Sequence, residues 1–547
     1  MRSLKDVCEA TAASQGALNL WRRRQGAMAL AAILVVALVL RVAATDFGLP
    51  YTYHPDEWAL IMPALRILQT GDFNPHRFVY GSAYIYALSG VYVLYFLAGV
   101  GAGAFGSIHD IPVLENYVST VRYPFPTVFL VGRLFNACIG TLTLWVVYAL
   151  ARRMWGRRHA LVAALLMAVA PLHVMLSHFA TTDVPMVLAV MVTLLAMLYA
   201  LETGAQQDRL VAAFLCGLTV SVKYTAVPIV APLVILFVQT ATKEERVWLE
   251  AAWALLTLAL GFLVGTPYSV LDVPTFLGGL AHDLRQYGPA GSKRLASCLA
   301  LFLKSLFSRY NVWLTVPALL GLPFLWTLPH PHTSTPPHSH TPTLLRGSKS
   351  ASWLMFSFPV LLAAQISLAS VHYVRTALPL VPFGALLASV AVVDGSNWVA
   401  RRLRWQGGAA RLALGFLAVM TLAMGAVSMR YDYLLAQDDV RTRTLRWIEA
   451  NLPRGSRVVV DRFSPYLPPG EWEVTQLFRV TDRPWDWYRE QQVQFLVVSQ
   501  VMRDSDNRTE EQERRYRELE AAFPLLATVE GPFLGDAGYR MWVYQVR

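Results

Sequence analysis

Charged residues, and lysine above all, are scarce in this chain, and their scarcity excludes most soluble protein classes. Only 15% of the 547 residues are charged, 55% are hydrophobic, and the mean hydropathy is +0.41. Lysine occurs at six positions, so arginine supplies most of the 47 basic residues. This composition is too apolar for a soluble globular protein and is typical of a multi-pass membrane protein. The net charge of +11 is then a signal of membrane topology rather than of nucleic-acid binding.

The sequence also lacks the cysteine spacings of disulfide and zinc sites, and its C-terminal region lacks the glycine-rich loop of a nucleotide-binding site. Cys8, Cys138, Cys216 and Cys298 are far apart, so the sequence has no disulfide or zinc spacing. From Arg430 onward it has neither a nucleotide-binding glycine pattern nor a nucleophile motif. A transporter would carry ionisable residues near the middle of its helices and an internal helix repeat, and we find neither. A transporter or flippase of a lipid-linked sugar therefore remains only the alternative to an enzyme.

Charge is concentrated at the C-terminal end, which divides the chain into two regions. About a third of the residues from Arg430 onward are charged, against about a tenth before it. We therefore expect a transmembrane domain over 26–430 and a soluble α/β domain over 431–547. The polar residues 1–25, which include a run of arginines, predict a cytoplasmic tail. The His- and Pro-rich residues 329–350 predict a cytoplasmic loop.

Basic clusters set the topology of the membrane domain. Residues 152–158 hold four arginines, which the positive-inside rule places in the cytoplasm. Phe78–Val100 is then a surface or re-entrant helix pair inside a large first outer loop, 46–126. Arg41 lies near the outer end of the first span, where its side chain can reach the interface. With the N-terminus inside, about eleven spans put the 431–547 domain outside: Gly26–Ala44, Val128–Ala151, Ala160–Leu176, Val184–Leu201, Leu210–Val222, Ala226–Gln239, Val247–Val264, Asn311–Leu328, Trp353–Val371, Ala377–Val393 and Leu412–Met429.

Two adjacent carboxylates, Asp56 and Glu57, follow the first apolar segment. Pro55 suits a helix start and Gly71 suits a helix end, and apolar residues recur between them at helical spacing. We therefore expect a helix over Asp56–Thr70 that lies along the membrane surface. The positive N-terminal end of such a helix favours an ionised carboxylate.

A small set of charged residues is expected at the outer ends of the helices. Each has a plain structural explanation, such as a helix cap for a carboxylate or an interfacial anchor for a cation. Basic and acidic groups on one face also suit an anionic lipid head group together with a proton acceptor. The set comprises Asp56, Glu57, Arg133, Asp183, Lys223 and Arg375. The spans on either side of Lys223 are short, which predicts kinked or tilted helices there.

Five short motifs follow one another along the chain: Tyr53–Glu57, Arg133–Asn136 with Arg152–Gly156, His178–Asp183, Gly217–Tyr224 and Tyr373–Pro379. Their order resembles that of the GT-C glycosyltransferases, in particular the protein O-mannosyltransferases (family 39) and the aminoarabinose transferases (family 83). The resemblance covers roughly residues 26–430. Arg77–Gly81 departs from it, because the aminoarabinose transferases carry an acidic-Lys-Pro-Pro stretch in that region.

The resemblance implies a mostly α, multi-pass membrane protein of GT-C architecture in a bacterial-type plasma membrane, with a small extracytoplasmic α/β domain. It implies transfer of a mannose-like or other hexose or pentose from a polyprenyl-phosphate carrier, by single displacement with inversion. The acceptor would be a protein hydroxyl, a lipid or an envelope glycan on the outer face.

The resemblance also implies roles for individual residues. Asp56 would be the catalytic base, and Lys223 and Arg375 would hold the phosphate. A divalent metal, with Asp56 and Asp183 as the candidate ligands, is left open. The residues implied in substrate binding are Glu57, Asp183, Lys223, Arg375, Arg133 and His54.

Overall fold

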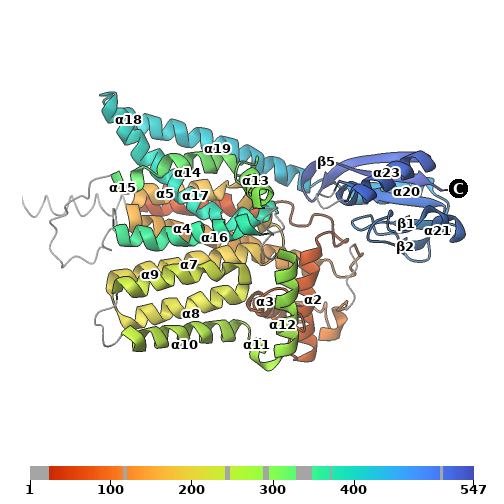
Figure 1. The fold of residues 1–547 in the computed structure, drawn as a ribbon, viewed down its shortest axis with the longest axis horizontal. Helices are drawn as coiled ribbons and strands as arrows, with labels where there is room; N and C mark the ends of the chain where they lie inside the picture. Colours follow the sequence, from red (N-terminus) through yellow and green to blue (C-terminus); the bar gives the residue numbers. More distant parts are fainter. Residues whose placement is uncertain are drawn as a thin grey trace, which may run out of the picture. The chain divides into compact units, whose positions relative to one another are not determined.

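The chain is mostly helical and ends in a small sheet (Figure 1). The computed structural model describes residues 24–114, 120–240, 247–287, 295–327, 348–369, 373–504 and 509–546. Most of the predicted 1–25 tail and of the 329–350 loop lies outside these residues. Among the described helices, eight are long and apolar enough to cross a membrane, or nine if one bent pair forms a single span. The predicted class, a helical membrane protein with a small α/β domain, is confirmed; the count of eleven spans and their sidedness stay predictions.

The helices follow the predicted apolar segments closely. Two of them, α5 and α6, form the bent pair, with an angle of 57° between them. The helices are Arg24–Val42, α2 Pro55–Thr70, α3 Ala83–Gly101, α4 Thr127–Trp155, α5 Arg157–Ala168, α6 Pro171–Ser177, α7 Asp183–Thr203, α8 Gln206–Val222, α9 Val230–Thr240, α10 Val247–Gly265, α11 Tyr268–Leu271, α12 Val273–Tyr287, α13 Leu295–Leu306, α14 Val312–Gly321, α15 Phe324–Thr327, α16 Lys349–Leu368, α17 Val381–Val390, α18 Ser396–Arg402 and α19 Gly408–Leu435.

Two regions differ from the expectations. Within the predicted segment Phe78–Val100, residues from Ala83 onward form one continuous helix, α3 Ala83–Gly101, rather than a helix pair, and α3 is among the helices able to cross a membrane. The sequence did not predict α12 and α13, because both are amphipathic and shorter than a span. Figure 1 shows α12 beside the ends of the long helices α8 and α10, and the Phe276 ring of α12 lies 6.4 Å from the Phe262 ring of α10.

Contacts divide the chain into two compact units. The first comprises residues 1–42, 73–87 and 135–428, and the second comprises 43–72, 88–134 and 429–547, as far as they are described. Most of the predicted outer loop 46–126 therefore shares a unit with the C-terminal residues, which the composition did not indicate. The predicted boundary at 430 stays a prediction.

In the first unit, α8 packs between α7 and α10. The contact with α10 is close because glycines face backbone on both helices. A Cβ on Gly217 would collide with the Leu258 carbonyl oxygen, and one on Gly261 with that of Phe214. Small residues at such crossings let helix backbones approach each other inside membranes.

The side chain of Arg41 lies inside the first unit, not at the interface as the sequence suggested. It is fully buried and donates to the carbonyl oxygens of Met167 and Ala168, at 3.0 and 3.1 Å. A third contact joins it to His173 Nδ1 at 3.0 Å. The end of α5 leaves carbonyl groups without helical partners, and Arg41 supplies donors for them.

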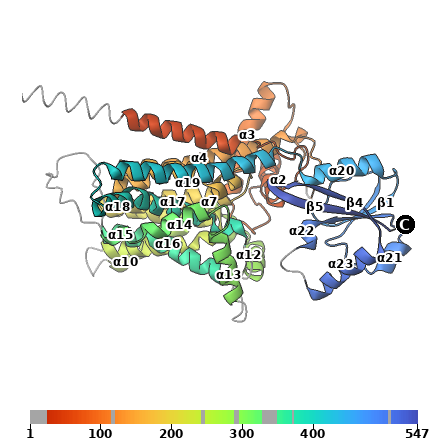
Figure 2. The same cartoon turned by 90° about the horizontal axis from the view of Figure 1, so that it is seen from above.

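In the second unit, a five-stranded sheet has the order β2-β1-β3-β5-β4. The strand β1 pairs in parallel with β2 and β3, whereas β5 pairs antiparallel with β3 and β4. Successive residues of β1 and β3 point to opposite faces, and both faces are covered (Figure 2). Helix α20 covers one face, and α21 and α23 cover the other. The elements are β1 Arg457–Val460, β2 Glu473–Gln476, β3 Phe495–Ser499, β4 Leu525–Phe533, β5 Asp536–Gln545, α20 Val440–Asn451, α21 Trp485–Glu490, α22 Gln500–Arg503 and α23 Glu510–Ala522.

Candidate active site

Helix α2 begins and ends where the sequence predicts, and it places Asp56 in its first turn. His54 caps the helix, because its Nδ1 accepts a hydrogen bond of 3.3 Å from the Asp56 backbone N–H. At the other end Gly71 adopts φ 70°, a left-handed conformation that suits glycine. The Asp56 side chain is half-buried at the positive end of the helix, which favours its ionised form. His54 therefore has a structural role here, and its substrate contact stays a prediction.

Glu57 and Arg133 form an ion pair with no exposed side-chain surface. Arg133 donates to both carboxylate oxygens of Glu57, at 2.8 and 2.9 Å. It also donates to the carbonyl oxygens of Thr45 and Phe47, and its guanidinium lies 3.7 Å from the centre of the Phe47 ring. A bidentate pair of this kind is strong and geometrically specific. Glu57 and Arg133 thus hold the start of α2 in place, and this arrangement favours positioning over direct substrate contact.

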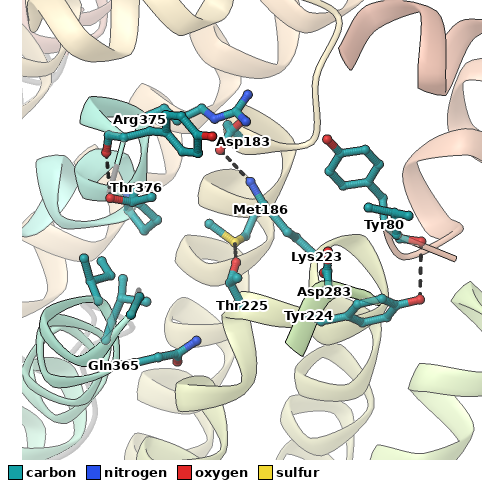
Figure 3. A pocket seen from close by; sticks show the side chains of 16 residues that line it. Tyr80, Asp183, Met186, Lys223, Tyr224, Thr225, Asp283, Gln365, Arg375 and Thr376 are labelled. Atoms are coloured by element: carbon teal, nitrogen blue, oxygen red, sulfur yellow. Dashed lines mark hydrogen bonds and ion pairs between the residues drawn. The ribbon is translucent and has the colours of Figure 1, made fainter. Parts of the chain in front are cut away.

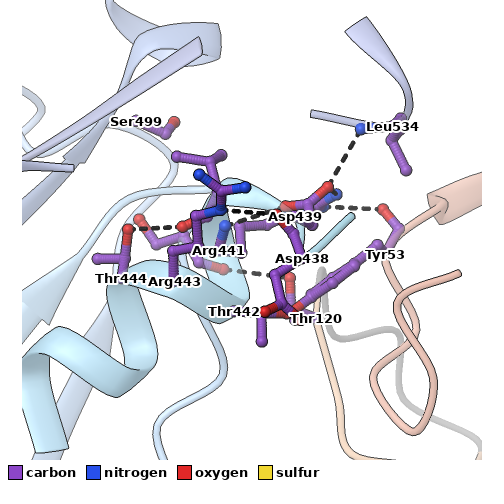
Figure 4. A network of polar contacts seen from close by, with 12 residues as sticks. Tyr53, Thr120, Asp438, Asp439, Arg441, Thr442, Arg443, Thr444, Ser499 and Leu534 are labelled. Carbon is purple, nitrogen blue, oxygen red and sulfur yellow. Dashed lines mark hydrogen bonds and ion pairs between the residues drawn. The ribbon is translucent and has the colours of Figure 1, made fainter. Parts of the chain in front are cut away.

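The backbone that leads into α2 is held by the C-terminal part of the same unit (Figure 4). Arg441 is fully buried and donates to the Tyr53 carbonyl oxygen at 3.0 Å. Its guanidinium lies 3.9 Å from the centre of the Tyr53 ring and 4.3 Å from that of Phe533. Asp439 accepts two hydrogen bonds from this guanidinium, at 2.8 and 2.9 Å. The Tyr53 hydroxyl also lies 2.6 Å from the Thr442 hydroxyl. The residues before Asp56 are therefore fixed by α20.

The first unit contains a cavity of about 170 Å³ that holds three of the predicted site residues (Figure 3). These are Asp183, Lys223 and Arg375. Most of the remaining wall is apolar or aromatic, and further polar groups come from segments that the sequence did not single out. The lining includes Val79, Tyr80, Met186, Tyr224, Thr225, Asp283, Leu362, Gln365, Ile366, Ala369, Tyr373, Thr376 and Pro379.

The two cations reach the cavity from places where the chain leaves α-helical geometry. Helix α8 ends at Val222, and Lys223 is extended, with φ −155° and ψ 124°. A 3-10 helix, Tyr224–Ile229, then leads into α9, so the α-helical path is interrupted at Lys223, and the predicted kink or tilt of the two helices stays a prediction. Tyr373 is extended in the same way, and the 3-10 helix Val374–Leu380, which contains Arg375, leads into α17.

Charge inside the cavity is arranged around Asp183, the first residue of α7. The Lys223 ammonium donates to an Asp183 carboxylate oxygen at 2.7 Å, and Asp183 is nearly buried. The guanidinium of Arg375 lies 5.1 Å from the centre of the Tyr373 ring. Fixed cations in a largely apolar wall stabilise negative charge more strongly than they would in water. Lys223 and Arg375 are therefore the groups of this cavity that can face an anion, beside the carboxylates of Asp183 and Asp283.

Known proteins share sequence features and the fold of this chain. Residues 125–270 match the family model described as dolichyl-phosphate-mannose-protein mannosyltransferase, a stretch that includes Asp183 and Lys223 but neither Asp56 nor Arg375. ArnT from Cupriavidus metallidurans in the apo state is 14% identical, with a TM-score of 0.53 over 97% of this chain and 98% of that one. The same ArnT bound to undecaprenyl phosphate is 15% identical, with a TM-score of 0.50 over 94% and 97%. No curated protein matches the chain by sequence.

The chain has the GT-C fold. It resembles the protein O-mannosyltransferase and aminoarabinose-transferase group, as the motifs indicate, and it is a membrane protein.

Sequence reasoning missed two parts of this GT-C cavity. Asp283 comes from α12, whose single carboxylate among apolar residues looks like any polar position of a surface helix. Tyr80 comes from Arg77–Gly81, the stretch that departs from the family pattern. Gly81 lets this stretch lie against α8, because a Cβ there would collide with the Ser221 carbonyl oxygen. Gly81 was therefore the residue in the sequence that indicated close packing of this stretch near Lys223.

The described part of the chain contains no group of three His, Cys, Asp or Glu side chains that could bind a metal ion. Lys223 already places a positive charge against the Asp183 carboxylate. A metal held by Asp56 and Asp183 therefore stays a prediction.

Proposed function

We propose that the protein is a glycosyltransferase that takes a sugar from a polyprenyl-phosphate carrier and transfers it to a hydroxyl group on the outer face of the plasma membrane. The observation that carries this proposal is the cavity with Lys223 and Arg375 in a chain of GT-C fold. The ArnT structure of the same fold was solved with undecaprenyl phosphate, which belongs to the class of carrier proposed here. The sugar is a mannose-like or other hexose or pentose, and the acceptor is a protein, a lipid or an envelope glycan.

The reaction is a single displacement at the anomeric carbon. The acceptor oxygen forms a bond to this carbon from the face opposite the phosphate, so the configuration inverts. The bond between the anomeric carbon and the phosphate oxygen breaks, and its electron pair stays with the carrier phosphate. Lys223 and Arg375 stabilise the negative charge that the phosphate gains as the bond breaks. Stabilisation of developing charge by fixed groups is usually the largest single contribution to catalysis.

Asp56 is proposed as the base that takes the proton of the acceptor hydroxyl. A carboxylate can serve in this role when it is ionised, and the start of α2 favours that state. The buried pair Glu57–Arg133 holds the first turn of α2, which leaves Asp56 as the carboxylate of this motif that is not enclosed. Glu57 and Arg133 are therefore proposed as positioning residues rather than as groups that touch the substrate.

The proposal is tested by incubating the purified full-length protein with a panel of polyprenyl-phosphate sugars and hydroxyl acceptors. Consumption of one donor with formation of the free polyprenyl phosphate supports it. Movement of an intact lipid-linked sugar across a proteoliposome membrane, without donor consumption, would instead point to the flippase alternative.

A further inference from the structure

Helix α12 presents one carboxylate to the cavity on a face that is otherwise apolar. Phe276, Gly279, Leu280 and Asp283 are half-buried and follow the spacing i, i+3, i+4, i+7, which defines a single face of a helix. The side chains on the opposite face, such as Arg285, are exposed.

Aromatic contacts fix this inward face of α12. The ring of Phe276 lies 5.8 Å from that of Phe78, 6.1 Å from that of Tyr224 and 6.4 Å from that of Phe262, each in an edge-to-face arrangement. Aromatic pairs of this geometry add stabilisation beyond that of burying their surface area. Asn74 also donates to the Asp272 carboxylate at the start of the helix, at 2.9 Å. The side chain of Asp283 is therefore held at the cavity by a well-packed helix.

The two carboxylates of the cavity differ in their partners. Asp183 accepts the hydrogen bond from Lys223. Asp283, by contrast, accepts no hydrogen bond from any residue that the structure describes, although it lines the cavity. Burial raises the pKa of Asp283 to about 6, against the opposing charges of His282 and Lys223, so the group is mostly ionised at pH 7.

A second carboxylate has no use in holding a phosphate, because its negative charge repels the anion. A hydrogen-bond donor or a cation on the ligand can satisfy it. The part of a polyprenyl-phosphate sugar that carries such donors is the sugar, through its hydroxyl groups. Tyr80 and Gln365 line the same cavity and can add neutral polar contacts to a sugar (Figure 3).

We propose that Asp283 recognises the sugar of the donor by accepting hydrogen bonds from its hydroxyl groups, and so restricts the enzyme to sugars without a negative charge. This inference rests on the proposed function, and it assigns Asp283 a role in specificity. A uronate-bearing donor would place a second carboxylate near Asp283 and is rejected by charge repulsion. A site that hydrogen-bonds a group of its ligand discriminates strongly against related ligands that leave the protein's polar group without a partner.

The experiment measures binding to the purified full-length protein of undecaprenyl phosphate and of a hexose-loaded undecaprenyl phosphate that the wild-type protein consumes. For Asp283→Ala we expect affinity for the hexose-loaded lipid to fall by about tenfold or more, as for a lost hydrogen bond to a charged group. Affinity for undecaprenyl phosphate should not fall, because the phosphate contacts remain and the carboxylate that is removed repels the anion. Arg285→Ala, on the exposed face of the same helix, is the matched control and should change neither value.

A second comparison tests the charge argument. The wild-type protein should bind a glucuronate-loaded undecaprenyl phosphate more weakly than the corresponding glucose-loaded lipid, and Asp283→Asn should reduce this difference. Equal losses for loaded and unloaded lipid in Asp283→Ala, or no loss for either, would overturn the inference and leave the proposed function standing. If the wild-type protein binds none of these lipids, the proposed function fails and the inference fails with it.

Discussion

At the scale of single residues, the cavity depends on two cations that reach it from different helices. Lys223 and Arg375 both follow a helix break, so their positions are set by backbone geometry rather than by surface chemistry. Lys223 also neutralises Asp183, which would otherwise repel a phosphate. Binding of an anionic donor head group should therefore be sensitive to each cation separately.

We predict that Lys223→Ala and Arg375→Ala each weaken donor binding by roughly 1.5–3 kcal/mol, the range for a hydrogen bond to a charged group. Isothermal titration with a polyprenyl phosphate, on folded protein, measures the change. Lys304→Ala is a suitable control, because Lys304 is an exposed lysine of the same unit. Wild-type affinity in both cavity variants would rule out their assignment to the phosphate.

The stability of the second unit should depend on pH because of Asp461, the residue that follows β1. It is fully buried, and burial raises its pKa to about 8, although Ser499 N–H and the Ser464 hydroxyl donate to it. The pKa of an unfolded Asp is about 3.9. The folded state therefore binds more protons between about pH 4 and pH 8, and stability should fall as pH rises through this window. Hydrogen exchange of residues 457–499 in the full-length protein measures this. Asp461→Asn should flatten the dependence of stability on pH. If this dependence keeps its slope in the variant, Asp461 is not its cause.

At the scale of elements, the sequence predicts best where several local signals agree. Pro55, Gly71 and the apolar spacing between them located α2 correctly. The strand β2 was missed because its four residues are all exposed and carry no alternation. Helix α12 was missed because an amphipathic helix at a cavity has the same pattern as one at the membrane surface.

The pairing of distant charges could not be predicted from the sequence. Arg133 and Glu57 are 76 positions apart, and nothing local distinguishes a buried pair from two exposed charges. The same holds for Arg41, whose partners lie 126 and 127 positions away in the bent pair α5–α6. Position near a helix end suggested the interface for Arg41, but carbonyl oxygens at the end of α5, inside the unit, accept its hydrogen bonds.

The anchor formed by Arg441 should be the most sensitive point of the second unit. Arg441→Ala would leave Asp439 without its cation, and breaking a buried pair in this way costs roughly 3–5 kcal/mol. Arg489→Ala removes an exposed arginine from a pair with Asp486 and should cost less than about 1 kcal/mol. Denaturant unfolding followed through the second unit's tryptophans compares the two. Equal midpoints for the two variants would mean that Arg441 does not anchor the residues before α2.

At the scale of the whole molecule, topology remains a prediction that labelling can test. The arginines of 152–158 predict that the loop around Ala104 and the C-terminal domain are both outside the cell. We expect Ala104→Cys and Glu490→Cys, in a background without the native cysteines, to react with a membrane-impermeant thiol reagent applied to intact cells. Both positions are exposed in the structure. Protection of both from the outer reagent would overturn the predicted sidedness.

The most direct test of the proposed mechanism is the turnover of Asp56→Asn. Asparagine keeps the shape of the side chain and removes its basicity, while His54, Glu57 and Arg133 still hold the start of α2. We predict that sugar transfer falls by roughly 10²–10⁴-fold, as for a lost general base, while affinity for the polyprenyl-phosphate sugar is unchanged. Single-turnover transfer and donor binding are to be measured on the same preparation. Transfer at the wild-type rate would contradict the assignment of Asp56 as the base and reopen the alternative of a transporter.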